Sequence, residues 1–252
     1  MAEIAKDAPT RVVWRNGAGG LTFEVGGRPD HWFVKWNPRS SQLDLPAEAE
    51  RLRWARQHVT TVAEVVGEGE DDDGTWLVTA ALPGDNAVIP RWKADPATAV
   101  RAIGDGLRHL HDALPVATCP FPWDVESRLE FIETNRVGDG RDPAGWHEDF
   151  RHLTWEDALR VLRDPPPVER LVVCHGDTCA PNTLLTDDGR FSGHVDLGQL
   201  GTADPWADIA IATWSLEWNY GPGWEPLLLD TYGVAADPAR TSYYRLLWEL
   251  GP

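Results

Sequence analysis

His-Gly-Asp-Thr-Cys-Ala-Pro-Asn-Thr-Leu-Leu-Thr-Asp-Asp-Gly-Arg-Phe-Ser-Gly-His-Val-Asp-Leu-Gly occupies residues 175–198 and is the most informative stretch of the chain. An apolar run at 171–174 predicts a buried strand that enters it, and 183–185 and 191–195 predict two further strands. The Asp-Asp-Gly turn at 187–189 joins these two strands into a hairpin. We expect the hairpin to place Asp196 at its end, facing back toward Asn182.

Three polar side chains of this stretch predict its chemistry: Asp177, Asn182 and Asp196. Phosphoryl transfer from a metal-bound nucleotide needs such a set, because one acid orients the attacking hydroxyl while amide and carboxylate oxygens hold the metal ions on the phosphates. We therefore expect Asp177 to be the catalytic base, and Asn182 and Asp196 to bind Mg²⁺, a hard ion that prefers oxygen ligands.

The pattern of the chain changes near residues 82–86. Strands are predicted before this point at 11–15, 21–25, 31–36, 62–66 and 75–81, with one helix at 46–58 and a charged turn at 68–73. Helices are predicted after it at 96–113, 125–136, 155–163, 205–218 and 238–250. The sequence therefore predicts an α+β protein with a β-rich lobe over 1–81, a hinge linker over 82–86 and a larger helical lobe over 87–252.

The ordered set of motifs resembles the kinase-like phosphotransferases, and most closely the aminoglycoside phosphotransferases that act on the 3'-hydroxyl. The motifs are His-Gly-Asp at 175–177, Pro-Asn at 181–182, Asp-Leu-Gly at 196–198 and the continuation at 203–210, with further likeness at 110–112, 119–121, 127–130 and 243–250. The resemblance implies a protein-kinase-like two-lobe fold. It also implies transfer of the γ-phosphate of ATP or GTP to a hydroxyl of an aminoglycoside antibiotic, which gives resistance.

The resemblance also assigns the nucleotide site to the first lobe and the linker. Lys35 would reach the α- and β-phosphates, with Glu48 as its acidic partner and Glu50 as the competing candidate. The Ala81 carbonyl and the Leu82 amide would recognise the nucleobase, with Phe33 against the base. Backbone recognition leaves ATP and GTP undistinguished. The glycine-rich segment 16–20 is a candidate cover for the phosphates, and the chain contains no phosphate-loop motif.

Other polar residues near the motifs are expected to be structural. We expect His175 to brace the catalytic loop rather than act as the base, and Asp208 to tie that loop through backbone donors; Asp204 is likewise expected to be structural. His109 and His111 are two residues apart on a predicted helix, so they point to different faces and do not form a ligand pair.

The acceptor pocket is expected in the helical lobe, where carboxylates can pair with ammonium groups. Glu249 is the preferred candidate, followed by Glu130 and Glu133, with Glu126 on the same helix; the alternative is that these acids are exposed helix surface. Two positions depart from the family pattern: Gln199 replaces an arginine, and Trp248 replaces an aspartate. A kinase for another small hydroxylated metabolite or antibiotic, or a silent nucleotide-binding protein, therefore stays open.

Composition limits the partners. The 252 residues carry 40 acidic and 23 basic side chains, a formal charge of -17. This charge argues against nucleic acid or an anionic membrane and suits a cationic substrate, although solubility alone also explains it. Three cysteines without a second pair argue against a zinc site and favour the reducing cytoplasm. No apolar run is long enough to span a membrane.

Overall fold

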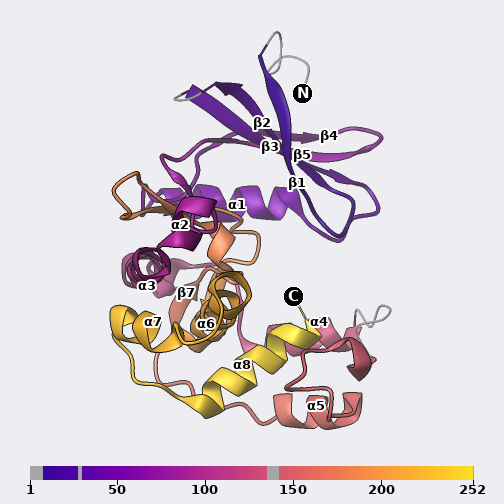
Figure 1. Cartoon of the computed structure of the whole chain (residues 1–252). Helices are drawn as coiled ribbons and strands as arrows, with labels where there is room; N and C mark the ends of the chain where they lie inside the picture. The colour runs from indigo at the N-terminus through magenta and orange to yellow at the C-terminus, as the bar shows by residue number, and fades with distance from the viewer. Residues whose placement is uncertain (1–7, 28–29, 135–141, 252) are drawn as a thin grey trace.

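The computed structural model describes residues 8–27, 30–134 and 142–251, which form two lobes joined at one side (Figure 1). Its strands are β1 Thr10–Arg15, β2 Leu21–Gly27, β3 Asp30–Pro38, β4 Val65–Glu70, β5 Gly74–Ala80, β6 Asp85–Asn86, β7 Val172–Cys174, β8 Thr183–Leu185, β9 Phe191–His194 and β10 Gly201–Ala203. Its α-helices are α1 Leu45–Arg56, α2 Pro90–Ala94, α3 Pro96–Ala113, α4 Val125–Thr134, α5 Trp155–Leu162, α6 Trp206–Tyr220, α7 Glu225–Tyr232 and α8 Pro238–Leu250. The predicted α+β class with a helical second lobe is confirmed.

The first lobe is an antiparallel sheet in the order β1-β2-β3-β5-β4, with α1 against one face. Alternation along β3 places Phe33 and Lys35 on one face of the sheet and Val34 on the other. The second face is closed by a small apolar cluster around Val34. Helix α1 begins at an N-cap, where the Asp44 carboxylate accepts a hydrogen bond from the Ala47 backbone N–H at 2.9 Å. The helix thereby presents its buried face toward Lys35.

The second lobe surrounds a large apolar core built from α3, α6, α7 and α8. Helix α6 is buried on all sides through most of its length: every residue from Trp206 to Leu216 is buried, and most of them are apolar. A helix with this pattern belongs in the middle of a core, and Figure 1 shows α6 between α7 and α8. The predicted helix at 125–136 is present as α4 as far as Thr134; residues 135 and 136 lie outside the described residues.

The junction between the lobes is tied by main-chain pairing and by apolar contacts. β6 pairs with β8 of the hairpin, and the His194 backbone N–H donates to the Thr61 carbonyl at 2.8 Å. One buried cluster combines Leu52 and Leu77 of the first lobe with Leu110, Val173, Leu197 and Leu200 of the second. The division of the chain at 82–86 stays a prediction, supported by the end of the sheet at Ala80.

One predicted strand was placed wrongly. The strand expected at 62–66 is β4, which begins at Val65 and continues to Glu70, so that the charged turn covers only 71–73. The charged residues from 68 onward suggested that the turn begins there, but the strand continues to Glu70. A Cβ atom at Gly69 would lie 2.5 Å from the Trp76 ring on the neighbouring strand. Glycine at position 69 therefore lets this edge strand pass over the Trp76 ring.

Candidate active site

The catalytic loop between β7 and β8 is held by the buried carboxylate of Asp208 on α6. Its Oδ2 accepts the His175 backbone N–H at 2.6 Å and its Oδ1 accepts the Gly176 N–H at 2.9 Å. Burial alone would raise the pKa of Asp208, but the His111 ring holds that pKa below its usual value. Gly176 has a φ of 88°, and a Cβ atom there would lie 2.4 Å from the Gln199 carbonyl oxygen. The predicted structural role of Asp208 is confirmed.

His175 braces the loop from inside. Its Nε2 lies 3.0 Å from the Val195 carbonyl, and its Nδ1 accepts the Asp177 backbone N–H at 3.2 Å. Because Nδ1 accepts, Nε2 is the nitrogen that donates to the Val195 carbonyl. Because both nitrogens are occupied by loop contacts, the bracing role predicted for His175 is confirmed.

Asp177 and Asn182 form a hydrogen-bonded pair at the centre of the site. The Asn182 amide Nδ2 donates to the Asp177 backbone carbonyl at 3.0 Å and to Asp177 Oδ2 at 3.1 Å. The other carboxylate oxygen, Asp177 Oδ1, is buried and has no hydrogen-bond partner among the described residues. The Cys179 thiol is adjacent, and burial together with the Asp177 charge raises its pKa, so it stays protonated there. Asp177 Oδ1 therefore keeps the capacity to accept a further hydrogen bond.

A three-member ion cluster connects the lobes. Lys35 Nζ lies 2.6 Å from Glu48 Oε1 and 2.5 Å from Asp196 Oδ1. Burial alone would lower the pKa of Lys35, but the Asp196 and Glu48 carboxylates outweigh it and raise the pKa above 10.5. Glu50 is exposed on the other side of α1. The sequence therefore identified the partner of Lys35 correctly as Glu48.

Asp196 is held in an unusual backbone conformation. Its φ of 64° makes it the one non-glycine residue with positive φ in the described part of the chain. Such strain costs on the order of 1–3 kcal/mol and concentrates at functional sites. The hairpin brings its main chain beside Asn182, since the Val195 N–H donates to the Asn182 carbonyl at 3.0 Å, but the carboxylate points to Lys35 rather than to Asn182.

The donor atoms of Asn182 and Asp196 fit a hard divalent cation. The Asn182 amide uses Nδ2 toward Asp177, which leaves its Oδ1 as the atom available to a ligand. The Asp196 side chain is 46% exposed at the cleft, and Lys35 holds its pKa low against the effect of burial. Amide and carboxylate oxygens are the ligands that Mg²⁺ takes beside nucleotide phosphates.

The groups expected at the nucleobase lie at the hinge. The Ala81 N–H donates to the His31 carbonyl at 3.1 Å, while the Ala81 carbonyl and the Leu82 N–H have no main-chain partner within the described ranges. Phe33 meets the His31 ring edge-on with centroids 5.4 Å apart. In the glycine-rich turn, Asn16 Oδ1 accepts the Ala18 and Gly20 N–H groups, so that these two donors already have partners.

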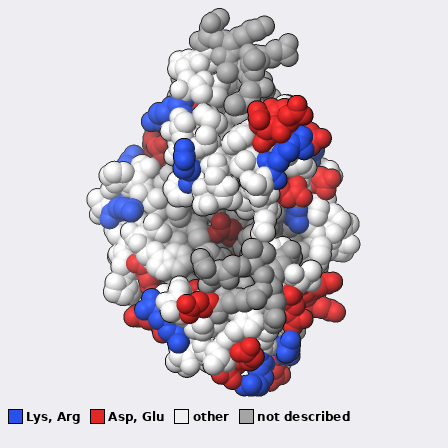
Figure 2. All heavy atoms as spheres, turned by 90° about the vertical axis from the view of Figure 1, so that its right-hand side faces the viewer, with Lys and Arg blue, Asp and Glu red and all other residues white. Residues whose placement is uncertain are grey.

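The predicted acceptor carboxylates differ in their surroundings. Glu249 near the end of α8 is half-buried, and its carboxylate accepts the His147 backbone N–H; burial raises its pKa above 4.5. Glu126 and Glu130 are exposed on α4, and Glu133 is paired with Arg163 at 2.6 Å. Figure 2 shows a hollow between the lobes with an acidic group at its floor. The substrate roles of these acids stay predictions.

A buried cluster and a cavity of the helical lobe do not belong to the candidate active site. A buried group of His111, Cys174 and Asp208 has metal-ligand chemistry, but His111 bonds Tyr232 and Asp208, and both Asp208 oxygens accept loop N–H groups. The group is therefore held together by hydrogen bonds and stabilises the catalytic loop.

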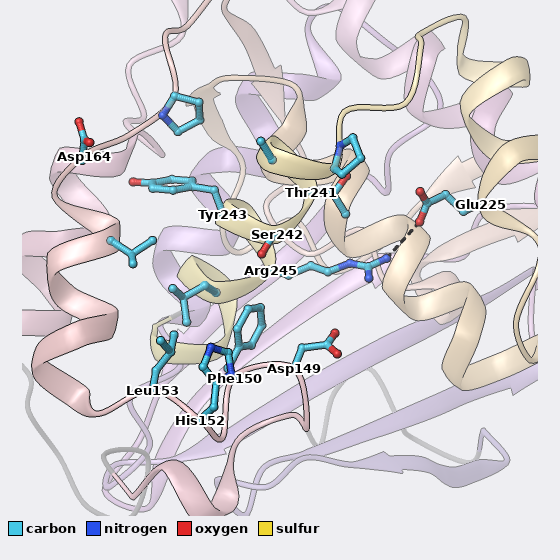
Figure 3. Close-up of a pocket in the computed structure, with 15 residues that line it drawn as sticks. Asp149, Phe150, His152, Leu153, Asp164, Glu225, Thr241, Ser242, Tyr243 and Arg245 are labelled. Atoms are coloured by element: carbon cyan, nitrogen blue, oxygen red, sulfur yellow. Dashed lines mark hydrogen bonds and ion pairs between the residues drawn. The ribbon is translucent and has the colours of Figure 1, made fainter.

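A cavity of about 730 Å³ lies between α5, α8 and the segment 149–153 and contains none of the catalytic residues. Figure 3 shows Tyr243 and Arg245 projecting into it, with Arg245 paired to Glu225.

This geometry can be compared with known proteins. The model of the phosphotransferase enzyme family matches residues 11–244. The chain belongs to this family. Among its curated relatives, the aminoglycoside 3'-phosphotransferase of Streptomyces fradiae is 36% identical, with 92% of this chain and 91% of the relative covered. The streptomycin 3''-kinase of Streptomyces griseus is 33% identical, with 84% and 82% covered.

Solved structures of the phosphotransferase family share the fold. An aminoglycoside-3'-phosphotransferase of type VIII superposes with a TM-score of 0.83 at 29% identity, covering 96% of this chain and 93% of the other. An aminoglycoside phosphotransferase from Streptomyces rimosus, in complex with ADP and streptomycin, gives 0.74 at 27% identity over 97% and 93%. The predicted kinship and two-lobe kinase-like fold are confirmed. In the described residues no helix has the length and apolarity of a membrane span.

Proposed function

We propose that this phosphotransferase transfers the γ-phosphoryl group of ATP or GTP to a hydroxyl of an aminoglycoside and thereby confers resistance. The observation that carries the proposal is the buried Oδ1 of Asp177, which is held beside Asn182 and has no hydrogen-bond partner among the residues that the structure describes. The names of the relatives, 3'-phosphotransferases and a streptomycin kinase, support a cationic sugar as the acceptor. The -17 charge favours the approach of such a substrate. A cytoplasmic location remains a prediction from the sparse cysteines.

The described residues suggest a mechanism based on positioning. Asp177 Oδ1 accepts the hydrogen bond of the acceptor hydroxyl and aligns its oxygen with the γ-phosphorus. Because the transition state of phosphoryl transfer is loose, alignment contributes more than early removal of the proton. As the new O–P bond forms, the bond between the γ-phosphorus and the bridging oxygen to the β-phosphate breaks, the nucleoside diphosphate leaves with that oxygen, and the hydroxyl proton passes to Asp177. Asn182 keeps the carboxylate in place through its Nδ2.

The nucleotide would enter between Lys35 and the hinge. Lys35, held by Glu48, would donate to the α- and β-phosphates once Asp196 turns away from it. Asn182 Oδ1 and the Asp196 carboxylate would hold Mg²⁺, which neutralises phosphate charge when bound. The Ala81 carbonyl and the Leu82 N–H would meet the base, with Phe33 beside it.

A steady-state assay with a panel of acceptors tests the proposal. ATP and GTP turnover is measured with cationic aminocyclitol glycosides and with neutral sugars that carry the same hydroxyls. We expect acceptor-dependent release of nucleoside diphosphate with the cationic members only. The KM for these acceptors should rise with salt concentration, because salt screens the attraction between exposed charges. Turnover with neutral sugars alone would replace the proposal by a kinase for another hydroxylated metabolite, which the substitutions Gln199 and Trp248 keep as the second candidate.

A further inference from the structure

Trp218 lies on α6, the helix that contacts both the catalytic loop and α8. One turn earlier on α6, Ser215 Oγ accepts the Ala180 backbone N–H of the catalytic loop at 2.8 Å. The preceding residue, Trp214, packs against Trp248 of α8 with centroids 6.0 Å apart. At about 100° per residue, Trp218 projects at about 40° from Trp214, between the directions of Trp214 and Ser215. Its indole therefore lies on the side of α6 that carries both Ser215, which holds the catalytic loop, and Trp214, and it contacts Trp248, the residue before Glu249.

Three tryptophans form a supported surface at this place. Trp214 is fully buried and serves as the base, with Trp218 at 5.2 Å and 39° to it. Trp218 and Trp248 are 5.7 Å apart with their planes at 41°, so the two rings form a shallow angle. Trp218 is 47% exposed, although indole carries a large apolar surface that proteins usually bury.

The charges around this surface favour a cation from solution. Glu249 follows Trp248 directly and keeps a half-buried carboxylate. Arg245 lies 5.4 Å from the Trp214 ring and is already paired with Glu217 at 3.6 Å and Glu225 at 3.3 Å. The His147 ring also contacts Trp214, and His147 and Arg151 lie close enough to Glu249 to offset part of the rise that burial causes in its pKa. Aromatic faces attract ammonium groups, and tryptophan does so most strongly. The surface thus offers π-electron density and a carboxylate, where sequence comparison had shown only the loss of an acid at position 248.

We propose that Trp218 and Trp248 form the floor of the acceptor site and bind an ammonium-bearing ring of the acceptor by cation–π contact, with Glu249 as the counter-charge. The inference rests on the proposed function, since it requires a cationic sugar as acceptor. In this proposal, the Trp248 ring attracts the ammonium group that an aspartate at position 248 would otherwise attract. It also makes Trp218 a determinant of acceptor specificity that leaves the nucleotide site untouched.

Trp218→Leu and Trp218→Phe test the proposal, with Trp248→Leu as the second site. Leucine keeps apolar bulk without a ring, and phenylalanine keeps a weaker ring. We expect Trp218→Leu to raise the acceptor KM about 5- to 30-fold, as loss of a partly desolvated cation–π contact predicts, with a smaller rise for phenylalanine. Nucleotide KM should not change. Trp14→Leu, at a 66% exposed position on β1, is the control and should leave acceptor KM unchanged.

Paired acceptors identify the interaction. Each pair has an amino group in one member and a hydroxyl at the same ring position in the other, and binding is also measured by calorimetry without nucleotide. The tryptophan variants should lose affinity for the amino member and little for the hydroxyl member. Equal losses, or wild-type acceptor KM in both leucine variants, would overturn the proposal. If the wild-type protein phosphorylates no cationic sugar at all, it is the proposed function that fails.

Discussion

Hydrogen bonds within the catalytic loop determine which polar atom of each side chain remains available to a ligand. Asn182 presents its oxygen because its nitrogen binds Asp177, and both ring nitrogens of His175 already have backbone partners. Asp177 Oδ1, in contrast, has no hydrogen-bond partner within the described part of the chain. The acid-amide-acid spacing predicted these residues from sequence, since all three lie within one loop and one hairpin. The contact between Trp218 and Trp248 was not predictable, because it depends on how two helices pack.

Replacing the candidate base measures its role. Asp177→Asn keeps the shape and the hydrogen bond to Asn182 but removes the charge that orients the acceptor hydroxyl. We expect kcat to fall by roughly 100-fold or more, within the general-base range of about 10²–10⁴, with nucleotide affinity unchanged. Asp187→Asn, in the fully exposed hairpin turn, is the matched control. Near-normal kcat in Asp177→Asn would remove this residue from the mechanism.

At the scale of elements, the active site depends on α6 and the hairpin acting as one unit. Asp208 links the first turn of α6 to the loop after β7, and Ser215 links a later turn to the end of that loop. These ties were foreseeable for Asp208 from the motif at 203–210. The short helices α2 and α7 and the strand β10 were not foreseen, because short segments give too little periodicity to be recognised. The position of β4 was missed because the charged residues 68–70 indicate a turn, whereas in the structure they belong to an edge strand in which Gly69 leaves room for the Trp76 ring.

Breaking the first of these ties is expected to loosen the loop. Asp208→Asn leaves one oxygen for the two N–H groups of His175 and Gly176 and turns an amide donor toward one of them. Removal of a buried charged acceptor should lower the free energy of unfolding by about 2–4 kcal/mol, measured by urea denaturation, and lower kcat as well. Asp112→Asn, in an exposed pair with Arg108, should change stability by less than about 0.5 kcal/mol. Equal stability of the two variants would contradict the role of Asp208.

For the whole molecule, the junction between the lobes contains a buried neutral histidine. Burial, with the neighbouring His175, lowers the pKa of His194 from 6.5 to about 3. The unfolded chain takes up this proton below pH 6.5 and the folded chain does not, so His194 opposes folding increasingly as the pH falls. Its ring packs between Phe191 and His175, and its main chain meets the first lobe at Thr61. Lowering the pH should therefore destabilise the junction between the lobes.

The size of this effect can be measured directly. His194 should reduce the free energy of unfolding by roughly 1.5 kcal/mol between pH 6.5 and pH 5. In His194→Phe, which does not titrate, the pH dependence over this interval should become flatter by that amount even if the variant is less stable at neutral pH. His58→Phe, at an exposed position, should keep the wild-type slope. If the free energy of unfolding depends on pH equally in wild type and His194→Phe, the folded protein takes up the His194 proton as readily as the unfolded chain, which would contradict this account.

Transfer of labelled phosphate tests most directly whether this cleft phosphorylates a cationic sugar. The γ-phosphoryl group of ATP is labelled, and the label on an aminoglycoside is measured with Mg²⁺ for the wild-type protein, Asp196→Ala and the hairpin control Asp188→Ala. We predict labelled aminoglycoside from wild type and control and none above background from Asp196→Ala, with the variant still folded by circular dichroism. Equal transfer by Asp196→Ala, or wild-type label recovered only as inorganic phosphate, would contradict the proposed phosphotransferase site.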